Sequence, residues 1–370
     1  MTDTTADEVR QRRRVDRAIA ELRRGVPVVL RGADGACVML AAETASPPAY
    51  LDCCQALPAA PVLALTAQRG AALRIRPSGH DPLLVELPDW LDLDTVQSLA
   101  DATTDLANPL RGPLERQMRA PTAAEFASIQ LSKHARLLPA AILWPLDGEI
   151  DAFAAENDLL TVESDAVATY ERVQAAALVP VGAAPVPLAD AVNSRIVAYR
   201  PADGGIEHLA IVIGQIQAKA PVLVRLHSEC FTGDLLGSLK CDCGEQLRGA
   251  IAAIEAAGSG IVLYLAQEGR GIGLINKLRA YRLQADGFDT VDANLRLGFE
   301  ADERLFEPAA AMLRQLGVGQ VRLLTNNPDK VAGLEACGIG VVERVAHSFP
   351  SNPHNAHYLA TKQTRSGHLF

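Results

Sequence analysis

Apolar residues in the first half of the chain recur with two different periods. Val15, Ile19 and Leu22 share one face of a short helix that Gly25 and Pro27 would end. Apolar runs that predict strands follow at residues 28–31, 37–42, 62–65, 83–87 and 140–144, and helical stretches such as 123–137 lie between them. This alternation predicts an α/β domain up to about residue 172.

The second half repeats the alternation after a stretch rich in Pro and Ala. Residues 175–189 contain three prolines, which a membrane helix or a buried strand would not readily accept, so we interpret them as a linker. Strands are expected at 196–199, 208–214 and 221–227, forming a small sheet or barrel. Further on, strands at 260–265, 321–325 and 340–345 alternate with helices at 245–257, 272–286 and 308–316. The predicted domains are therefore 1–175 and 193–370, joined by a linker at 176–192.

Composition narrows the fold class and the possible partners. Aromatic residues make up only 4% of the chain, so aliphatic side chains should fill the cores of an α/β or α+β fold. The net charge of −9 arises in the first 190 residues, with 17 Lys+Arg and 26 Asp+Glu, because the remainder holds 18 of each. This balance argues against nonspecific nucleic-acid binding and leaves a focused basic pocket possible in the second half.

Charged residues begin at once at the N-terminus, at Asp3, Asp7 and Glu8, and no apolar stretch of signal-peptide type follows before Val26. We therefore expect a cytoplasmic protein without a membrane partner.

Three of the seven cysteines are clustered. Cys230, Cys241 and Cys243 form a C-x10-C-x-C pattern, which suggests metal ligands in a reducing compartment. Zinc favours four ligands, so three thiols leave room for the water molecule of a catalytic site. His227 could instead close a structural site, and buried thiols without a metal are a third possibility. Spacing alone leaves these alternatives open.

A glycine-rich run at 267–273 follows the strand 260–265 and precedes a helix, so its backbone N–H groups could face an anion. An ordinary strand-to-helix turn is the alternative. Charged residues that suit a polyanion and a guanine edge accumulate in the same half. They are Arg225, Arg270, Lys277, Arg279, Arg282, Arg304 and Lys330, with Glu229, Glu268, Asp302 and Glu303 among them.

Five ordered stretches together resemble GTP cyclohydrolase II. They are 225–230 (RLHSEC), 237–246 (GSLKCDCGEQ), 267–273 (QEGRGIG), 297–304 (LGFEADER) and 324–328 (LTNNP), the last followed by Lys330. The resemblance covers roughly residues 193–370. It implies hydrolysis of GTP at C8 with loss of formate and pyrophosphate, giving a diaminopyrimidinone ribosylamino phosphate for riboflavin synthesis. It also implies a zinc ion that activates water, and magnesium with the triphosphate.

The resemblance assigns roles residue by residue. Cys230, Cys241 and Cys243 would hold zinc, Asp302 would accept a proton, and Tyr281 matches a further active-site position. Arg304 matches a proposed nucleophile at the α-phosphorus, although a guanidinium stabilises phosphate charge more readily than it attacks. The implied GTP contacts are Arg225, Leu226, His227, Ser228, Glu229, Gln246, Glu268, Gly269, Arg270, Thr290, Thr325 and Lys330. The sequence departs from the family pattern at Ala266, where some relatives carry a basic residue. This difference bears on one expected phosphate contact and not on the reaction.

Residues 15–46 and 122–146 resemble a degenerate dihydroxybutanone phosphate synthase. The acidic loop of that family is reduced to Asp34, and its Gly-His-Thr-Glu run is replaced by residues 120–125 (APTAAE). One carboxylate cannot supply the oxygen cage that magnesium needs for enolisation. We therefore predict a noncatalytic scaffold, with a dimerising or regulatory role, and keep a bifunctional enzyme as the alternative.

Two functions of different classes fit the second half. The first is the GTP-opening hydrolase, acting as a homodimer with GTP as its small-molecule partner. The second is a GTP-binding sensor that has lost turnover. The intact set of three cysteines and Asp302 argues against the sensor.

Overall fold

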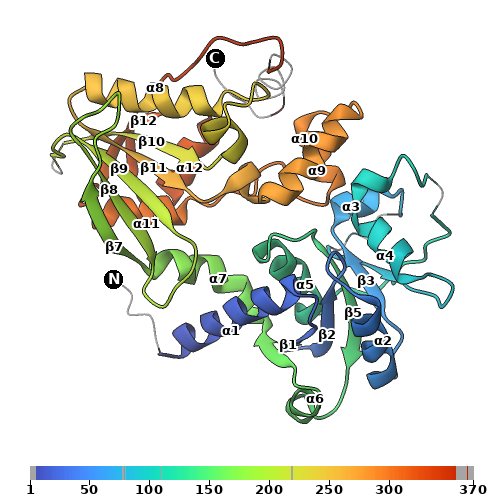
Figure 1. Ribbon diagram of the computed structural model, residues 1–370. Helices are drawn as coiled ribbons and strands as arrows, with labels where there is room; N and C mark the ends of the chain where they lie inside the picture. The colour runs from blue at the N-terminus through green and yellow to red at the C-terminus, as the bar shows by residue number, and fades with distance from the viewer. Residues whose placement is uncertain are drawn as a thin grey trace. The chain divides into compact units, whose positions relative to one another are not determined.

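Two mixed β-sheets organise the residues that the computed structural model describes, which are 6–76, 79, 81–109, 111–217, 220–355 and 365 (Figure 1). The chain forms two compact units. The first extends to Val173 and also contains Ile275–Asp302, whereas the second contains Gln174–Leu274 and the chain from Glu303 onward. Each unit carries one sheet with helices, which confirms the predicted α/β class.

The first unit is built on a six-stranded sheet with the order β4-β3-β5-β2-β1-β6. Strands β1 and β2 form an antiparallel hairpin, and β6 runs parallel to β1. Helices α1 and α5 pack on this sheet, and their buried aliphatic side chains share one core with it. The α-helices and strands that begin before Val173 are α1 (Ala6–Arg23), β1 (Val28–Gly32), β2 (Gly35–Ala41), α2 (Pro47–Ala56), β3 (Val62–Leu65), α3 (Ala67–Ala72), β4 (Leu83–Glu86), α4 (Leu93–Ala100), α5 (Ala123–His134), β5 (Ala140–Leu146), α6 (Ile150–Glu156), β6 (Leu160–Glu163) and α7 (Ser164–Ala176).

The second unit is built on a seven-stranded sheet with the order β13-β12-β10-β11-β9-β8-β7. Helix α11 contributes to the apolar core that contains Val224 and Leu323, and α8 contributes to another that contains Leu223 and Val262. Successive residues of a strand point to opposite faces, so the two helices cover the two faces of the sheet. The elements are β7 (Leu178–Pro185), β8 (Ser194–Pro201), β9 (His208–Ile213), β10 (Val222–Ser228), α8 (Cys243–Ala256), β11 (Gly260–Leu265), α11 (Glu307–Gln315), β12 (Gln320–Leu324), α12 (Pro328–Ala336) and β13 (Gly340–Val345).

Strand direction in this sheet determines where a site can form. Strand β10 is parallel to both β11 and β12, and β12 is parallel to β13, whereas β9, β8 and β7 continue the sheet in antiparallel pairs. The carboxyl ends of β10, β11 and β12 therefore meet at one edge, where open α/β sheets bind their ligands. The sheet is open, so the barrel that the sequence left possible does not form.

The linker prediction was wrong over much of its length. Leu178–Pro185 form β7, which pairs with β8 along one edge of the sheet, with a register shift between Pro180 and Gly182. Prolines are tolerated there because one side of an edge strand makes no ladder hydrogen bonds. Apart from Leu178, the residues of β7 are exposed, so the argument against a buried strand holds.

The sequence also did not predict that part of the chain after residue 193 belongs to the first unit. Residues Ile275–Asp302 belong to the first unit, although the sequence places them inside a continuous domain at 193–370. This segment contains α10 (Thr290–Arg296) and, apart from its first residue, α9 (Leu274–Ala285). None of the described helices is long and apolar enough to cross a membrane.

Candidate metal centre and nucleotide site

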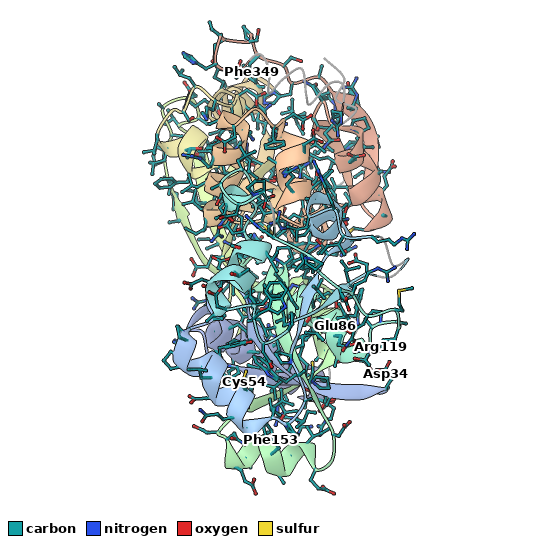
Figure 2. All side chains as sticks on the ribbon, turned by 90° about the vertical axis from the view of Figure 1, so that its right-hand side faces the viewer. Asp34, Cys54, Glu86, Arg119, Phe153 and Phe349 are labelled. Carbon is teal, nitrogen blue, oxygen red and sulfur yellow. The ribbon has the colours of Figure 1, made fainter. Side chains whose placement is uncertain are left out.

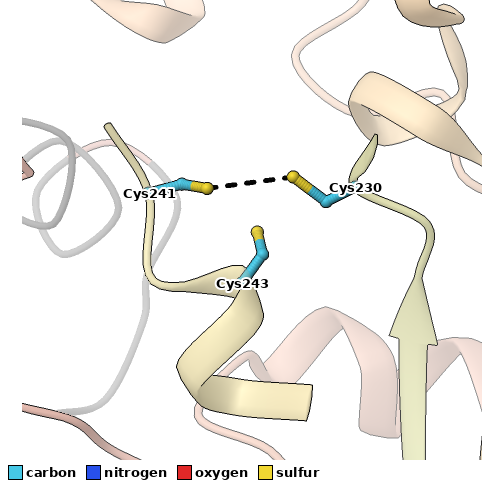
Figure 3. A group of neighbouring side chains, drawn as sticks. All are labelled: Cys230, Cys241 and Cys243. Atoms are coloured by element: carbon cyan, nitrogen blue, oxygen red, sulfur yellow. Dashed lines mark hydrogen bonds between the residues drawn. The ribbon is translucent and has the colours of Figure 1, made fainter. Parts of the chain in front are cut away.

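Three thiols converge just beyond the carboxyl end of β10. Cys230 precedes a π-helical turn at Phe231–Leu235, and Cys243 is the first residue of α8. The three sulfur atoms lie within 4.8 Å of one another, with 3.8 Å between those of Cys230 and Cys241 (Figure 3). In a tetrahedral zinc site with Zn–S bonds of about 2.3 Å, sulfur atoms lie about 3.8 Å apart. The donor set and its spacing therefore fit zinc.

Gly233 allows the thiols to come this close. A Cβ atom at this position would lie 2.8 Å from the Cys241 sulfur, 2.9 Å from the Cys243 Cβ and 3.0 Å from the Cys230 sulfur. The Gly233 N–H also donates to the Cys230 sulfur at 3.4 Å. The turn thus supplies a hydrogen bond to a ligand atom and leaves no room for a side chain.

Contact with the Cys230 thiol disfavours ionisation of the other two thiols. Contact with Cys230 is the largest cause that raises the pKa of Cys241, to about 11, and contact with Cys230 and then Cys241 raises the pKa of Cys243. Bringing thiolates together costs free energy because like charges approach, and a divalent cation reverses this preference. The cluster is suited to a cation.

His227 does not complete the thiol cluster. Its Nε2 donates to the Asp234 carboxylate at 3.0 and 3.1 Å, and its ring stacks on Tyr264 with 5.5 Å between centroids. The Tyr264 hydroxyl donates to the same carboxylate at 3.0 Å. Burial is the largest cause that lowers the pKa of His227, which favours the neutral ring. Among the described residues, the metal-binding group contains three protein ligands, which leaves a tetrahedral ion one open position.

Two buried cations come from β10 and α12. Arg225 donates to the Leu324 carbonyl at 2.9 Å and to the Gln246 side-chain oxygen at 2.5 Å, and Gln246 donates to Asp242 at 2.5 Å. Burial lowers the pKa of Arg225 to about 10, while Asp242 opposes the shift. The Lys330 ammonium group donates to the Leu226 carbonyl at 2.8 Å. Positive charge is thus held at the carboxyl edge of the sheet.

The glycine-rich turn after β11 has an unusual backbone. Gly269 and Arg270 have φ values of 65° and 64°, a left-handed conformation that costs an arginine free energy and is often found at functional sites. The buried Glu268 carboxylate accepts hydrogen bonds from the backbone N–H groups of Phe231, at 2.6 Å, and Gly269, at 2.9 Å. This carboxylate joins the turn to the segment that follows Cys230.

The same turn holds the chain next to Arg304. The Glu303 N–H donates to the Arg270 carbonyl at 3.0 Å, and Gly271 packs so closely on Glu303 that a Cβ would lie 2.6 Å from its carbonyl oxygen. The positive charge of Arg304 also lowers the pKa of Arg225, after burial. Arg304 therefore contributes to the same positive field.

The remaining predicted residues divide between the units. Glu229 donates its N–H to the Leu265 carbonyl at 2.8 Å, next to Ser228 at the end of β10, and the buried Thr325 hydroxyl accepts from the Asn327 N–H at 3.0 Å. The three others, Tyr281 on α9, Thr290 at the start of α10 and Asp302, lie in the first unit. Their part in the site stays a prediction.

Sequence reasoning missed Gly233 and Asp234, which shape the cluster and hold His227. Both lie inside the ten-residue interval between Cys230 and Cys241. A glycine in the loop of a metal-binding pattern was the available signal for the first, and no sequence signal pointed to the second.

Comparisons with known proteins agree with these motifs. A family model described as GTP cyclohydrolase II matches residues 181–346. The chain is 52% identical over 362 residues to a GTP cyclohydrolase-2 of Azospirillum brasilense, covering 97% of this chain and 94% of the relative. It is 40% identical over 295 residues to the riboflavin biosynthesis protein RibBA of Parabacteroides distasonis, covering 75% and 72%. Among solved structures, RibBX, a two-domain 3,4-dihydroxy-2-butanone 4-phosphate synthase from A. baumannii, aligns with a TM-score of 0.35 and 15% identity, covering 89% of this chain and 99% of that one.

Replacing Gly233 tests the metal centre directly. We expect Gly233→Ala to weaken zinc binding about 10- to 100-fold, the range for lost supporting contacts around metal ligands, because its Cβ would push the sulfur atoms apart. Zinc retained against a competing chelator measures the effect. Gly319→Ala is the matched control, since its added Cβ would meet no described atom within 4 Å beyond its own chain neighbours. Equal zinc retention in both variants would contradict the assignment.

Proposed function

The chain belongs to the GTP cyclohydrolase II family and is an enzyme of that activity, and we propose that it opens the imidazole ring of GTP at C8. Two water molecules add in turn at C8, so that both C–N bonds there break and formate is released. A third water molecule displaces pyrophosphate from the α-phosphorus. The product is the diaminopyrimidinone ribosylamino phosphate that begins riboflavin synthesis. The cluster of three thiols within 4.8 Å is the observation that carries this proposal.

Zinc is the proposed cofactor, because three thiolates and an open position suit a tetrahedral ion that also takes water. When bound, it supplies Lewis-acid activation of a water molecule. Cys230, Cys241 and Cys243 would hold it, whereas His227 stays paired with Asp234. Three thiolates donate strongly and weaken the acidifying effect of a metal, so a protein group should accept the proton. We assign that role to Asp302.

The buried and half-buried cations would bind the triphosphate. Arg225, with a pKa of about 10, keeps its charge at neutral pH, and Lys330 and Arg270 add to it. Arg304 would stabilise charge that develops at the α-phosphorus, since a guanidinium that stays protonated at neutral pH is a poor nucleophile. Magnesium would accompany the triphosphate and neutralise the leaving pyrophosphate.

The first unit is proposed to lack synthase chemistry. Asp34, at the turn between β1 and β2, accepts a hydrogen bond from the Ala123 N–H at 2.9 Å. Glu125 closes a capping box with Thr122 and pairs with Arg119 at 2.5 Å, on the side of the unit where Figure 2 shows Asp34 and Arg119. Among the described residues no carboxylate cluster gathers as a metal site. These acids hold the fold of the unit, which supports the scaffold over the bifunctional alternative.

A GTP-binding sensor without turnover is the competing function. The hydrogen bonds of Arg225 and Lys330 to protein groups are compatible with both the sensor and the hydrolase. The sensor has no need of an open metal position, whereas hydrolysis requires one, so the three-thiol cluster favours the enzyme.

Turnover of GTP by the full chain decides between the two. Incubation with GTP, Mg²⁺ and Zn²⁺ should release formate and pyrophosphate in equal amounts and change the ultraviolet spectrum as the purine is lost. Thermal stabilisation by GTP without formate would establish the sensor and contradict the hydrolase.

Two substitutions separate the metal from the proton acceptor. Cys241→Ser should lose both zinc and ring opening, because a hydroxyl replaces a thiolate ligand. Asp302→Ala should keep zinc and lower turnover about 10²- to 10⁴-fold, the usual contribution of a general base. Metal analysis beside a formate assay measures both, and Cys337→Ser, outside the cluster, is the matched thiol control. Equal zinc loss in the Cys241 and Asp302 variants would overturn the roles.

A further inference from the structure

The segment Ile275–Asp302 leaves the second unit and packs on the first. Helix α10 lies beside α3 (Figure 1). The segment carries Asp302, the proposed proton acceptor, together with Thr290 and Tyr281, which the family resemblance places in contact with GTP and at a further active-site position. The contacts that hold it therefore bear on catalysis.

A buried arginine fastens the end of α10. Arg69, on α3, is only 1% exposed, and its guanidinium donates to both Asp105 oxygens at 2.8 Å, to the Leu99 carbonyl at 2.7 Å and to the Arg296 carbonyl at 3.3 Å. Arg296 is the last residue of α10, so a cation meets the carbonyl end of that helix, where its dipole favours positive charge.

Asp105 links this contact to a second one. Besides Arg69, it accepts from the Arg296 side chain at 3.1 Å and lies 3.1 Å from Arg111. One largely buried carboxylate therefore serves three guanidinium groups, of which Arg296 alone belongs to the segment. Such a shared carboxylate fixes the position of α10, because losing it would leave buried cations unpaired.

Helix α9 is fastened by a separate set of contacts. Arg279 pairs with Glu43 at 3.0 Å and with Asp101 at 3.2 Å. Its other donor reaches Asn276 at 2.7 Å, and the fully buried Asn276 donates to the Arg136 carbonyl at 3.1 Å. Arg279 is thus committed to the first unit, and is not available to the phosphate cluster in which the sequence placed it.

Just before Asp302, the segment packs closely on other residues of the first unit. Gly298 has a φ of 88°, and a Cβ there would lie 2.8 Å from the Thr66 hydroxyl oxygen and 2.9 Å from the Pro139 ring. The neighbouring Phe299 is 1% exposed. The backbone that leads into Asp302 therefore follows the surface of the first unit closely.

We infer that the degenerate N-terminal domain is a positioning platform for residues 275–302, with Glu43, Arg69 and Asp105 as positioning residues for Tyr281, Thr290 and Asp302. This inference rests on the proposed function for the role of Asp302, and on the family resemblance for those of Tyr281 and Thr290. A domain without synthase chemistry thereby acts on the GTP reaction through α9 and α10.

Substitution at the Glu43–Arg279 pair in the full chain tests the platform. Glu43→Gln keeps an acceptor for the Leu138 N–H, which Glu43 binds at 2.7 Å, and removes the charge. We expect kcat to fall and KM to rise, lowering kcat/KM about tenfold, within the range that small misplacements produce. Zinc content should stay unchanged, and hydrogen exchange should quicken within 275–302. A merely structural role would lower kcat and zinc together through a smaller folded fraction, with KM unchanged.

A double-mutant cycle that combines Glu43→Gln with Arg279→Gln gives a second test of the platform. Since Glu43 acts on the segment through Arg279, which also pairs with Asp101, the double variant should lose about as much kcat/KM as the Arg279 variant alone loses, rather than the product of the two effects. Asp151→Ala is the matched control, because it breaks an exposed ion pair with Arg31 in the same unit, 3.0 Å long, and touches neither helix. It should leave kcat/KM within about twofold.

The outcomes distinguish the two proposals. A wild-type chain that does not open GTP would defeat the proposed function, while exchange in 275–302 would still report on the platform. An active wild type with unchanged KM, kcat and exchange in the Glu43 variant would overturn the platform alone.

Discussion

The spacing of three sulfur atoms is the constraint on which the second unit depends. A tetrahedral ion requires thiolates about 3.8 Å apart, and the chain must bring them there from residues 230 to 243. Parallel pairing of β10 with β11 and β12 opens an edge at which Cys230 can stand, and α8 begins at Cys243. The π-helical turn closes the distance because Gly233 has no side chain. Much of the local architecture follows from this requirement.

Buried charge is the second organising feature, and it costs stability. Arg225, Lys330 and Glu268 are all buried, and each is held by backbone groups or by a neighbouring polar side chain. Burying an ion is unfavourable unless its hydrogen bonds are satisfied, and apolar side chains of similar size would often stabilise the fold more. These charged side chains are buried at one edge of the sheet, and Arg270 there has a left-handed backbone conformation. Such departures from ordinary folding preferences are expected at functional sites, so this edge indicates a ligand-binding site.

The sequence predicted most of the elements of the second sheet, because β10, β11 and β12 are dense in aliphatic residues with clear boundaries. It predicted the thiol cluster too, since three ligands within fourteen residues leave little conformational choice. It failed at β7, because proline argues against strands in general but not against an edge. It also left open whether His227 is a metal ligand, because its partner Asp234 is brought to it only by the turn that follows Cys230.

The excursion at 275–302 was beyond sequence reasoning for a different reason. The segment has ordinary helical periodicity, and nothing in that pattern shows which core it joins. What decides the matter is complementarity with distant residues: Glu43 and Asp101 for Arg279, and Asp105 for Arg296. Each is a single side chain separated by more than 170 residues from its partner. The acids that hold α9 and α10 are Glu43, Asp101 and Asp105, and Asp34, which accepts the Ala123 N–H, is not among them. The proposed scaffold role of the first unit therefore does not require synthase chemistry.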